Sequence, residues 1–347
     1  MEMESTINKI LDNVYSENSC FFCGRELTPN NNSEEHVIPK WIQKKFNLWN
    51  EKMVLLNGTS IPYKSLKVPC CKECNGEFLS SVEKQVAAAI RSGVDAVRNL
   101  NKEVLFIWLG KMFLGLHYKE LSLPIDRTNP QSEMISSPEI LERMKLHRLF
   151  LQSVRGEVVC NDFVPYSILV FECKAPDNPR GGWDFVDNWF GPFISVRIGN
   201  IGIISVLQDC QTLEQAWNEN MSMYYDKILH PIQFGELESR AFYQATRFNR
   251  TPKYIIRTEE NGQNCEVHCP PLMGMSCKSV YNEWNIEEYC NILAWRLGLP
   301  LKQLYYPEVN QAWTFLHDAE NDFCDIECTD DFKIIDRNKE PTNWLEK

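Results

Sequence analysis

Apolar residues recur at three- and four-residue steps over 77–100, a period that predicts an amphipathic helix. A second helix is predicted over 103–119, where large apolar side chains cover most of the helical circumference, so this helix should be buried. One lysine, Lys111, interrupts it, and we expect its ammonium group to snorkel or to be ion-paired. Further helices are expected at 138–154, 212–229, 235–248 and 284–297.

Between these helices, runs of β-branched and aromatic residues predict strands near 164–173, 192–198, 201–208 and 253–257. Helices mixed with neighbouring antiparallel strands, without regular βαβ alternation, indicate the α+β class. We expect a first module at 1–100 and an α+β domain at 101–347 that recognises a target, a partner or a trigger. The boundary should fall near residues 90–102, with no flexible linker.

Composition places the chain among ordered globular proteins. It has 347 residues, of which 44% are hydrophobic and 12% aromatic, enough for two domains with well-formed cores. No apolar run reaches the length of a membrane span, and the first residues are acidic, unlike a signal peptide. The chain holds 14 cysteines, several of them clustered, which fits a reducing compartment. We therefore expect a cytoplasmic protein with no membrane partner.

Two Cys-x2-Cys knuckles stand tens of residues apart, Cys20 with Cys23 and Cys71 with Cys74. Each knuckle presents two thiolates from one tight turn, and four thiolates are a common ligand set of structural Zn²⁺. The pattern therefore predicts a zinc site that joins the two segments. Cys70 precedes the second knuckle, but its spacing to Cys74 is wrong, so we expect it to be a bystander.

An acid–histidine pair, Glu35-His36, followed by Val-Ile-Pro, lies between the knuckles, and Asn75 directly follows the last cysteine. A zinc site alone requires none of these three residues. Taken together, the knuckles, the Glu-His-Val-Ile-Pro run and the asparagine resemble the HNH endonuclease superfamily with its ββα-metal fold. The motif order is that of its zinc-stapled, endonuclease VII-like branch. This resemblance covers about residues 15–90.

The resemblance implies roles for these residues. Glu35 and Asn75 would hold a catalytic divalent metal, Mg²⁺ or Mn²⁺, while His36 would be the general base. The four knuckle cysteines would hold structural zinc. Glu83, some two turns along the following helix, is implied as a further ligand of the catalytic metal. The chemistry agrees, since a neutral imidazole near its usual pKa can take a proton from water, and a hard cation on oxygen ligands stabilises a leaving oxygen.

Some features depart from the family pattern. Many members carry an asparagine between the histidine and the second knuckle, and the nearest candidate here is Asn57. An Asn-Gly pair such as Asn57-Gly58 is, however, typical of a hairpin turn, and we prefer that interpretation. The last histidine of the family name is replaced by Asn75. The long segment between His36 and Cys71 implies an insertion.

Charge is distributed unevenly. The net charge is −11, yet residues 1–100 are balanced, so all of the excess acid lies in 101–347. Within 40–72, seven lysines face one acid, which fits contacts to phosphate, although a solvated lysine-rich loop is the simpler alternative. The residues we expect to contact nucleic acid are Lys40, Lys44, Lys45, Lys64 and Lys67. The acidic second domain favours a protein partner or a homo-oligomer.

The leading interpretation is a metal-dependent HNH endonuclease that cuts DNA. A nuclease module joined to an acidic, unrelated domain resembles effectors of bacterial antiviral defence in its architecture. Two alternatives stay open: a zinc-stapled module that binds nucleic acid or protein without catalysis, and a nuclease that cuts RNA.

Later cysteines form two further groups. The spacing within these groups is irregular, and buried free cysteines are common in protein cores, so we do not expect a second zinc site. The groups are Cys265, His268, Cys269 and Cys277, then Cys324 and Cys328.

Overall fold

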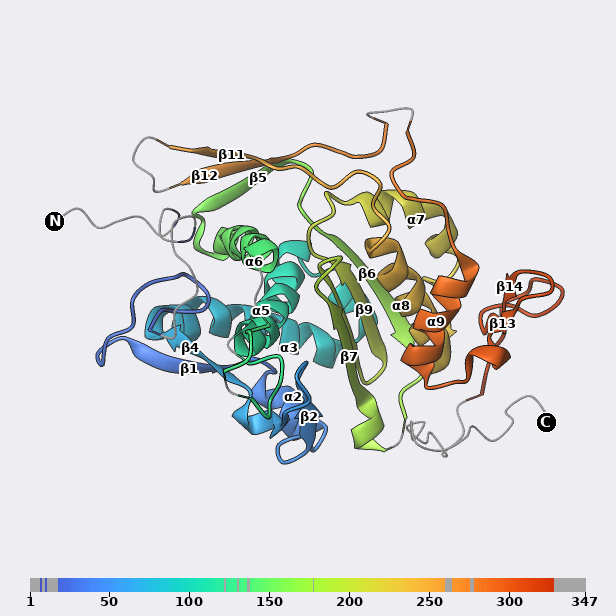
Figure 1. Cartoon of the computed structure of the whole chain (residues 1–347), viewed down its shortest axis with the longest axis horizontal. Helices are drawn as coiled ribbons and strands as arrows, with labels where there is room; N and C mark the ends of the chain where they lie inside the picture. The colour runs from blue at the N-terminus through green and yellow to red at the C-terminus, as the bar shows by residue number, and fades with distance from the viewer. Residues whose placement is uncertain are drawn as a thin grey trace.

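The structure, a computed structural model, has mixed α+β architecture, and the predicted fold class is confirmed (Figure 1). It describes residues 7, 10, 18–121, 123–129, 131–135, 138–176, 178–259, 264–274 and 278–327.

The N-terminal region contains a ββα-like unit. Strand β1 (Asn32–His36) pairs antiparallel with β4 (Lys67–Cys71), with Asn32 opposite Cys71 and His36 opposite Lys67. The chain then enters a π-helix, Cys74–Leu79, which continues into α3 (Ser80–Ser92). This order places both ends of the predicted motif, Glu35-His36 and Asn75, on one small unit.

The predicted insertion folds beside this unit. It begins with the short helix α2 (Lys40–Lys45) directly after β1 and continues into a two-stranded hairpin. Its remaining elements are β2 (Lys52–Val54), β3 (Ser60–Pro62) and a 3-10 turn at Tyr63–Ser65.

Helix α5 (Lys102–Leu121) runs through the middle of the molecule and is buried along most of its length, as its apolar circumference predicts (Figure 1). The single helix predicted over 77–100 is divided. Its first part, α3, is capped by Gly93, which has a φ of 106°, and a second helix, α4 (Val94–Arg98), follows. A positive φ suits glycine, so the break is encoded at that residue.

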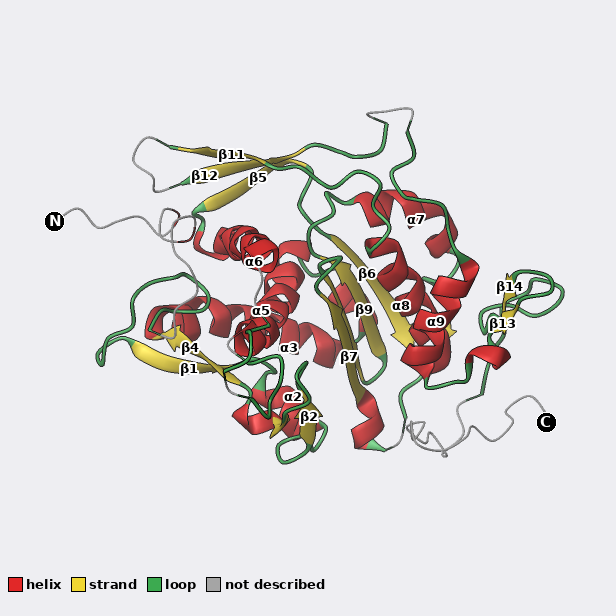
Figure 2. Ribbon diagram, viewed as in Figure 1, coloured by secondary structure: helices red, strands yellow, loops and turns green. Residues whose placement is uncertain are grey.

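A five-stranded sheet follows α5 in the order β10-β6-β9-β8-β7 (Figure 2). Every residue of the two strands β8 (Phe193–Ile198) and β9 (Ile201–Val206) is buried, because α5 contacts one side of the sheet and α8 (Pro231–Ala245) the other. Gly202 permits this packing, since a Cβ there would lie 2.3 Å from the Phe234 ring. The other strands are β6 (Ser167–Cys173), β7 (Trp183–Asn188) and β10 (Ile228–Leu229).

The remaining elements surround this core. The described part of the chain has a three-stranded sheet in the order β11-β12-β5, in which β12 runs parallel to β5. Sequence patterns missed β5, β7 and β12, which mix polar with apolar residues, and the two-residue strands β10, β13 and β14; the helix expected at 212–229 ends at Ser222, before β10. The bounds are α6 (Pro138–Leu151), β5 (Val158–Asp162), α7 (Thr212–Ser222), β11 (Ile255–Thr258), β12 (Cys265–Cys269), α9 (Ile286–Leu297), β13 (Tyr305–Tyr306) and β14 (Gln311–Ala312), with 3-10 turns at Gln152–Arg155, Pro179–Gly182 and Leu301–Gln303.

The hydrophobic core continues across the expected boundary at residue 100. One cluster of buried side chains runs from Ile7 to Cys269 and includes residues of the ββα-like unit, α5 and the sheet. At the insertion, Phe46 packs so closely on Gly182 that a Cβ there would lie 2.5 Å from its ring. Residues 1–100 and the rest of the described chain therefore share one core. The division into two domains near residue 100 stays a prediction.

A buried ionic cluster also joins the two parts. His117 of α5 lies 3.1 Å from the Asp187 carboxylate of β7 and 3.5 Å from that of Glu120. Burial alone would lower the pKa of His117, but the two carboxylates outweigh it and the pKa is raised. Glu120 in turn accepts a hydrogen bond from the backbone N–H of Leu56, which ties the insertion to α5.

Within the described residues, no helix is long and apolar enough to cross a membrane.

Gly115 of α5 permits the close approach of β1, and it provides a test of this packing. A Cβ at Gly115 would lie 2.9 Å from a methyl carbon of Val37, the residue after His36. We expect Gly115→Ala to lower the free energy of unfolding by about 1–3 kcal/mol, because overpacking forces the strand away from the helix. Thermal and urea denaturation measure this loss.

Gly76→Ala is the matched control, because no atom lies within 4 Å of a Cβ at Gly76 and its φ is not positive. Its stability should be unchanged or raised. Equal destabilisation by both substitutions would contradict the packing argument.

Candidate metal centre and catalytic cluster

The four predicted zinc ligands come together in the fold. The sulfur atoms of Cys20, Cys23, Cys71 and Cys74 lie within 4.8 Å of one another, and all four residues are buried. The Cys23 and Cys71 sulfurs are 3.9 Å apart, close to the ~3.8 Å edge of a tetrahedron with zinc–sulfur bonds of 2.3 Å. The donor set, its burial and its spacing therefore fit a structural zinc ion.

Cys70 lies outside this group of four. Its sulfur is 3.9 Å from that of Cys20, but it does not share the common 4.8 Å spacing. Adjacent residues of a strand point to opposite faces, so β4 directs Cys70 and Cys71 to different sides. Among the described residues, the four-cysteine group is the one cluster of at least three metal-binding side chains.

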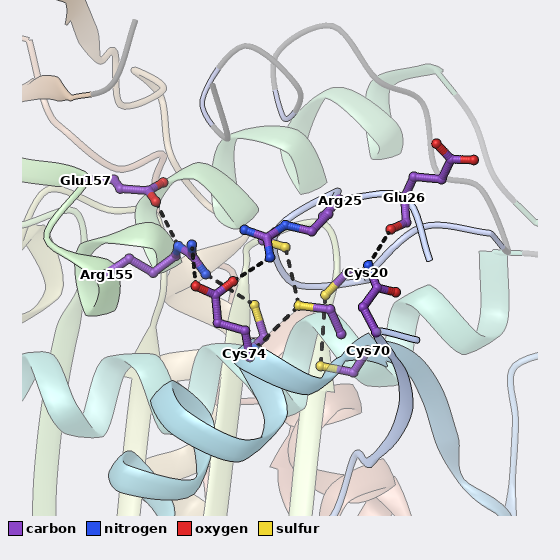
Figure 3. A network of polar contacts seen from close by, with 11 residues as sticks. Cys20, Arg25, Glu26, Cys70, Cys74, Arg155 and Glu157 are labelled. Carbon is purple, nitrogen blue, oxygen red and sulfur yellow. Dashed lines mark hydrogen bonds and ion pairs between the residues drawn. The ribbon is translucent and has the colours of Figure 1, made fainter. Parts of the chain in front are cut away.

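A charged network covers the cysteine cluster (Figure 3). Arg155, in the 3-10 turn after α6, lies with Nη1 3.6 Å from the Cys74 sulfur. Its guanidinium also contacts Glu157 at 2.8 Å and Glu73 at 3.4 Å, and Arg25 pairs with the other side of Glu73 at 2.7 Å. The two guanidinium groups are balanced by the carboxylates of Glu73 and Glu157, so the network as a whole is neutral, and within it Arg155 is the cation in contact with a cysteine sulfur. Sequence reasoning missed Arg155, which lies 81 residues beyond Cys74.

The second cluster is built from three segments. Glu35 is the second-last residue of β1, Glu83 lies in the first turn of α3, and Lys111 lies in the middle of α5. The Lys111 ammonium donates to Glu35 Oε1 at 2.5 Å and to Glu83 Oε1 at 2.6 Å. Its third contact is the backbone oxygen of His36, at 3.3 Å. The structure thus brings Glu35 and Glu83 onto one cation, which is a lysine side chain.

Burial governs the charges of this cluster. The Lys111 side chain is 1% exposed, so it is fully buried and ion-paired, and of the two predicted alternatives snorkelling is wrong. Burial alone would lower the pKa of Lys111, but the two carboxylates raise it above its ordinary value. Burial and the nearby Glu83 carboxylate also raise the pKa of Glu35, against the opposing effect of Lys111.

His36 is 8% exposed and stacks on Trp49 of the insertion, with ring centroids 5.9 Å apart. Its Nε2 atom is buried and finds no hydrogen-bond partner among the described residues. Burial, reinforced by three nearby lysine ammonium groups, lowers the pKa of His36 to about 4. This value is lower than the sequence led us to expect, and it keeps the ring neutral at physiological pH, with one nitrogen available.

Asn75 lies beside the strand and makes no described contact with the Glu35 carboxylate. Its side-chain amide donates to Ser33 Oγ at 3.1 Å and to the backbone oxygen of Glu34 at 3.0 Å. Glu35 and Asn75, the predicted pair of metal ligands, therefore have no partner atom in common. Glu83, the added candidate, shares a partner with Glu35 instead.

Asn57 has a structural role, as preferred from the sequence. It lies in the turn between β2 and β3, where its side chain accepts from the Thr59 N–H and donates to the backbone oxygen of Pro124. Gly58 beside it has a φ of 77°. These contacts place Asn57 in a hairpin turn fixed by hydrogen bonds.

The predicted nucleic-acid lysines lie around the end of β1. Lys40, Lys44 and Lys45 belong to α2 and are exposed. Lys67 pairs with Glu34 at 2.9 Å, and Lys64 contacts the Asn50 side chain at 2.8 Å, so these two are partly engaged.

The later cysteines do not form a metal cluster within the described residues. Cys265 and Cys269 are buried on β12, while His268 lies 3.7 Å from Glu266. Cys277 and Cys328 lie outside the described residues.

No family model matches the chain, and neither a curated protein nor a solved structure does.

The zinc assignment predicts different results for two neighbouring cysteines. Cys71→Ser should abolish stoichiometric zinc and lower the thermal stability, because a hydroxyl is a poor zinc ligand. Cys70→Ser should keep the zinc content of the wild type. Metal analysis of the purified proteins measures both, and equal zinc loss in the two variants would contradict the assigned ligand set.

Proposed function

We propose that the chain is a metal-dependent endonuclease of the HNH type that hydrolyses phosphodiester bonds of DNA. The observation that carries this proposal is a neutral histidine with an unpartnered buried nitrogen, next to two carboxylates that converge on a cation. The ββα-like unit that holds them also carries the four-cysteine cluster.

His36 is the general base in this proposal. The ring is neutral at physiological pH, and its Nε2 atom lacks a protein partner among the described residues, so this nitrogen is the proton acceptor in the proposal, although the lowered pKa makes it a weaker base than a free imidazole. The stack on Trp49 fixes the plane of the ring. A base held in one orientation loses little entropy when the water approaches.

Glu35, Asn75 and Glu83 are the residues that would hold the divalent metal. The two carboxylates fit a cation, since one oxygen of each lies within 2.6 Å of a single ammonium nitrogen. Asn75 is held on the same strand by Ser33 and Glu34. When bound, Mg²⁺ or Mn²⁺ would stabilise the negative charge that develops on the leaving oxygen.

The lysines of α2 and of β4 are the DNA contacts in this proposal. Helix α2 begins four residues after His36, so its exposed lysines follow the base directly along the chain. Lys40 and Lys67 are near enough to the His36 ring to lower its pKa. Such charges favour a phosphate backbone over a neutral substrate.

A non-catalytic, zinc-stapled binding module is the second candidate. The observation that favours it is Lys111, which already occupies one oxygen of both Glu35 and Glu83. Such a module would keep the zinc and the lysines and would bind nucleic acid or protein without a divalent ion.

Plasmid nicking in Mg²⁺ or Mn²⁺ separates the two candidates. We expect the wild type to nick DNA and His36→Ala to lose at least 100-fold in rate at matched zinc content, the usual loss for a general base. His268→Ala, a histidine of β12 outside this cluster, is the matched control and should retain activity. Nicking that survives His36→Ala would refute the assignment of the base. If the protein cleaves RNA but not DNA, the proposed substrate is wrong and RNA replaces it.

DNA binding tests the lysines of α2 independently of catalysis. Lys44→Ala with Lys45→Ala should weaken binding and make the slope of log K against log salt about 2 units shallower, because two phosphate contacts are lost. The exposed pair Lys253→Ala with Lys302→Ala serves as the control for net charge. Equal weakening by both double variants would show that only overall charge matters.

A further inference from the structure

Lys111 has a geometry that an ordinary buried ion pair does not require. Its ammonium nitrogen has three acceptors, at 2.5, 2.6 and 3.3 Å, and these come from Glu35, Glu83 and the backbone of His36. An ammonium group has three N–H donors, so all of them are used. The nitrogen thus joins β1 to α3, which carry two of the three proposed metal ligands, Glu35 and Glu83.

The charges around Lys111 do not cancel. With both acids ionised, two carboxylates and one ammonium leave a net charge of −1, and the side chains of Lys111, Glu35 and Glu83 are only 1%, 10% and 24% exposed. Each carboxylate gives Oε1 to Lys111 and has a second oxygen. Without the ammonium, two negative groups would face each other in a poorly solvated place, which is strongly unfavourable.

We propose that Lys111 is a positioning residue that takes the place of a cation between Glu35 and Glu83, so that a divalent ion competes with it for the two carboxylates. This inference rests on the proposed function, which provides the divalent ion. Lys111 keeps β1 and α3 together in the metal-free protein. It also lowers the affinity of the site, because it occupies one oxygen of each carboxylate and, in this proposal, an ion bound by both carboxylates displaces it from at least one of them.

The test compares Lys111→Met with the wild type, both loaded with zinc and free of other metals. Methionine is unbranched and of similar length, but it has no charge. Titration with Mn²⁺, followed by electron paramagnetic resonance, should give at least tenfold tighter binding in Lys111→Met. Mn²⁺ should also raise the thermal midpoint of this variant more than that of the wild type. Unchanged affinity, or an equal rise in both proteins, would overturn the proposal.

Lys145→Met is the matched control. Lys145 lies on α6 and pairs with a single carboxylate, that of the largely exposed Glu142, at 2.9 Å. Loss of this surface ion pair should leave the thermal midpoint nearly unchanged and should not change the affinity for Mn²⁺. Tighter Mn²⁺ binding in this control would also overturn the proposal.

A crystal structure of the wild type grown with Mn²⁺ covers the case in which Lys111→Met fails to fold. The proposal requires the ion at Glu35 and Glu83, with Lys111 displaced from at least one of them. An ion bound while both lysine contacts persist would overturn the competition.

The nicking assay keeps the two proposals separate. Tighter Mn²⁺ binding in Lys111→Met, with no nicking by any protein, would support the inference and refute the nuclease. Nicking by the wild type, with unchanged Mn²⁺ affinity in Lys111→Met, would support the nuclease and refute the inference.

Discussion

A cation without access to water must meet its counter-charges inside the protein, and Lys111 imposes this condition at the middle of helix α5. The helix is buried on nearly all sides, so the ammonium cannot reach solvent along its surface. Two carboxylates from separate elements satisfy it, which fixes β1 and α3 against the helix. One turn further along α5, Gly115 lets Val37 approach, so the same helical face holds the strand by charge and by packing.

The cysteine cluster was predictable from the sequence because its ligands are constrained by local spacing. A Cys-x2-Cys knuckle is one tight turn, and two knuckles need only one ion to join them. The long apolar helices were predictable for a similar reason, since their period is visible within a single segment. Glu83 was identified through a family resemblance, and its contact with Lys111 gives it a structural reason to lie at the cluster.

The partners of Lys111 and the role of Arg155 could not be predicted in this way. Lys111 stands 76 residues from Glu35 along the chain, and a lone lysine on an apolar helix carries no information about which acid it meets. Asn75 shows the same limit, because its amide donates to Ser33 and Glu34 of β1, which lie 42 and 41 residues earlier in the chain. Strands β5, β7 and β12 were missed since their pairing, rather than their own pattern, stabilises them.

The π-helix at Cys74–Leu79 leads from the second cysteine knuckle into α3, and its wider turn holds one residue more than an α-helical turn. Successive residues of an α-helix are rotated by about 100° around the axis, so one residue more or fewer changes the direction in which all later side chains of the helix point. Glu83 lies four residues beyond the end of this segment. The direction in which the Glu83 carboxylate points, relative to the second cysteine knuckle, therefore depends on the wider turn of this segment.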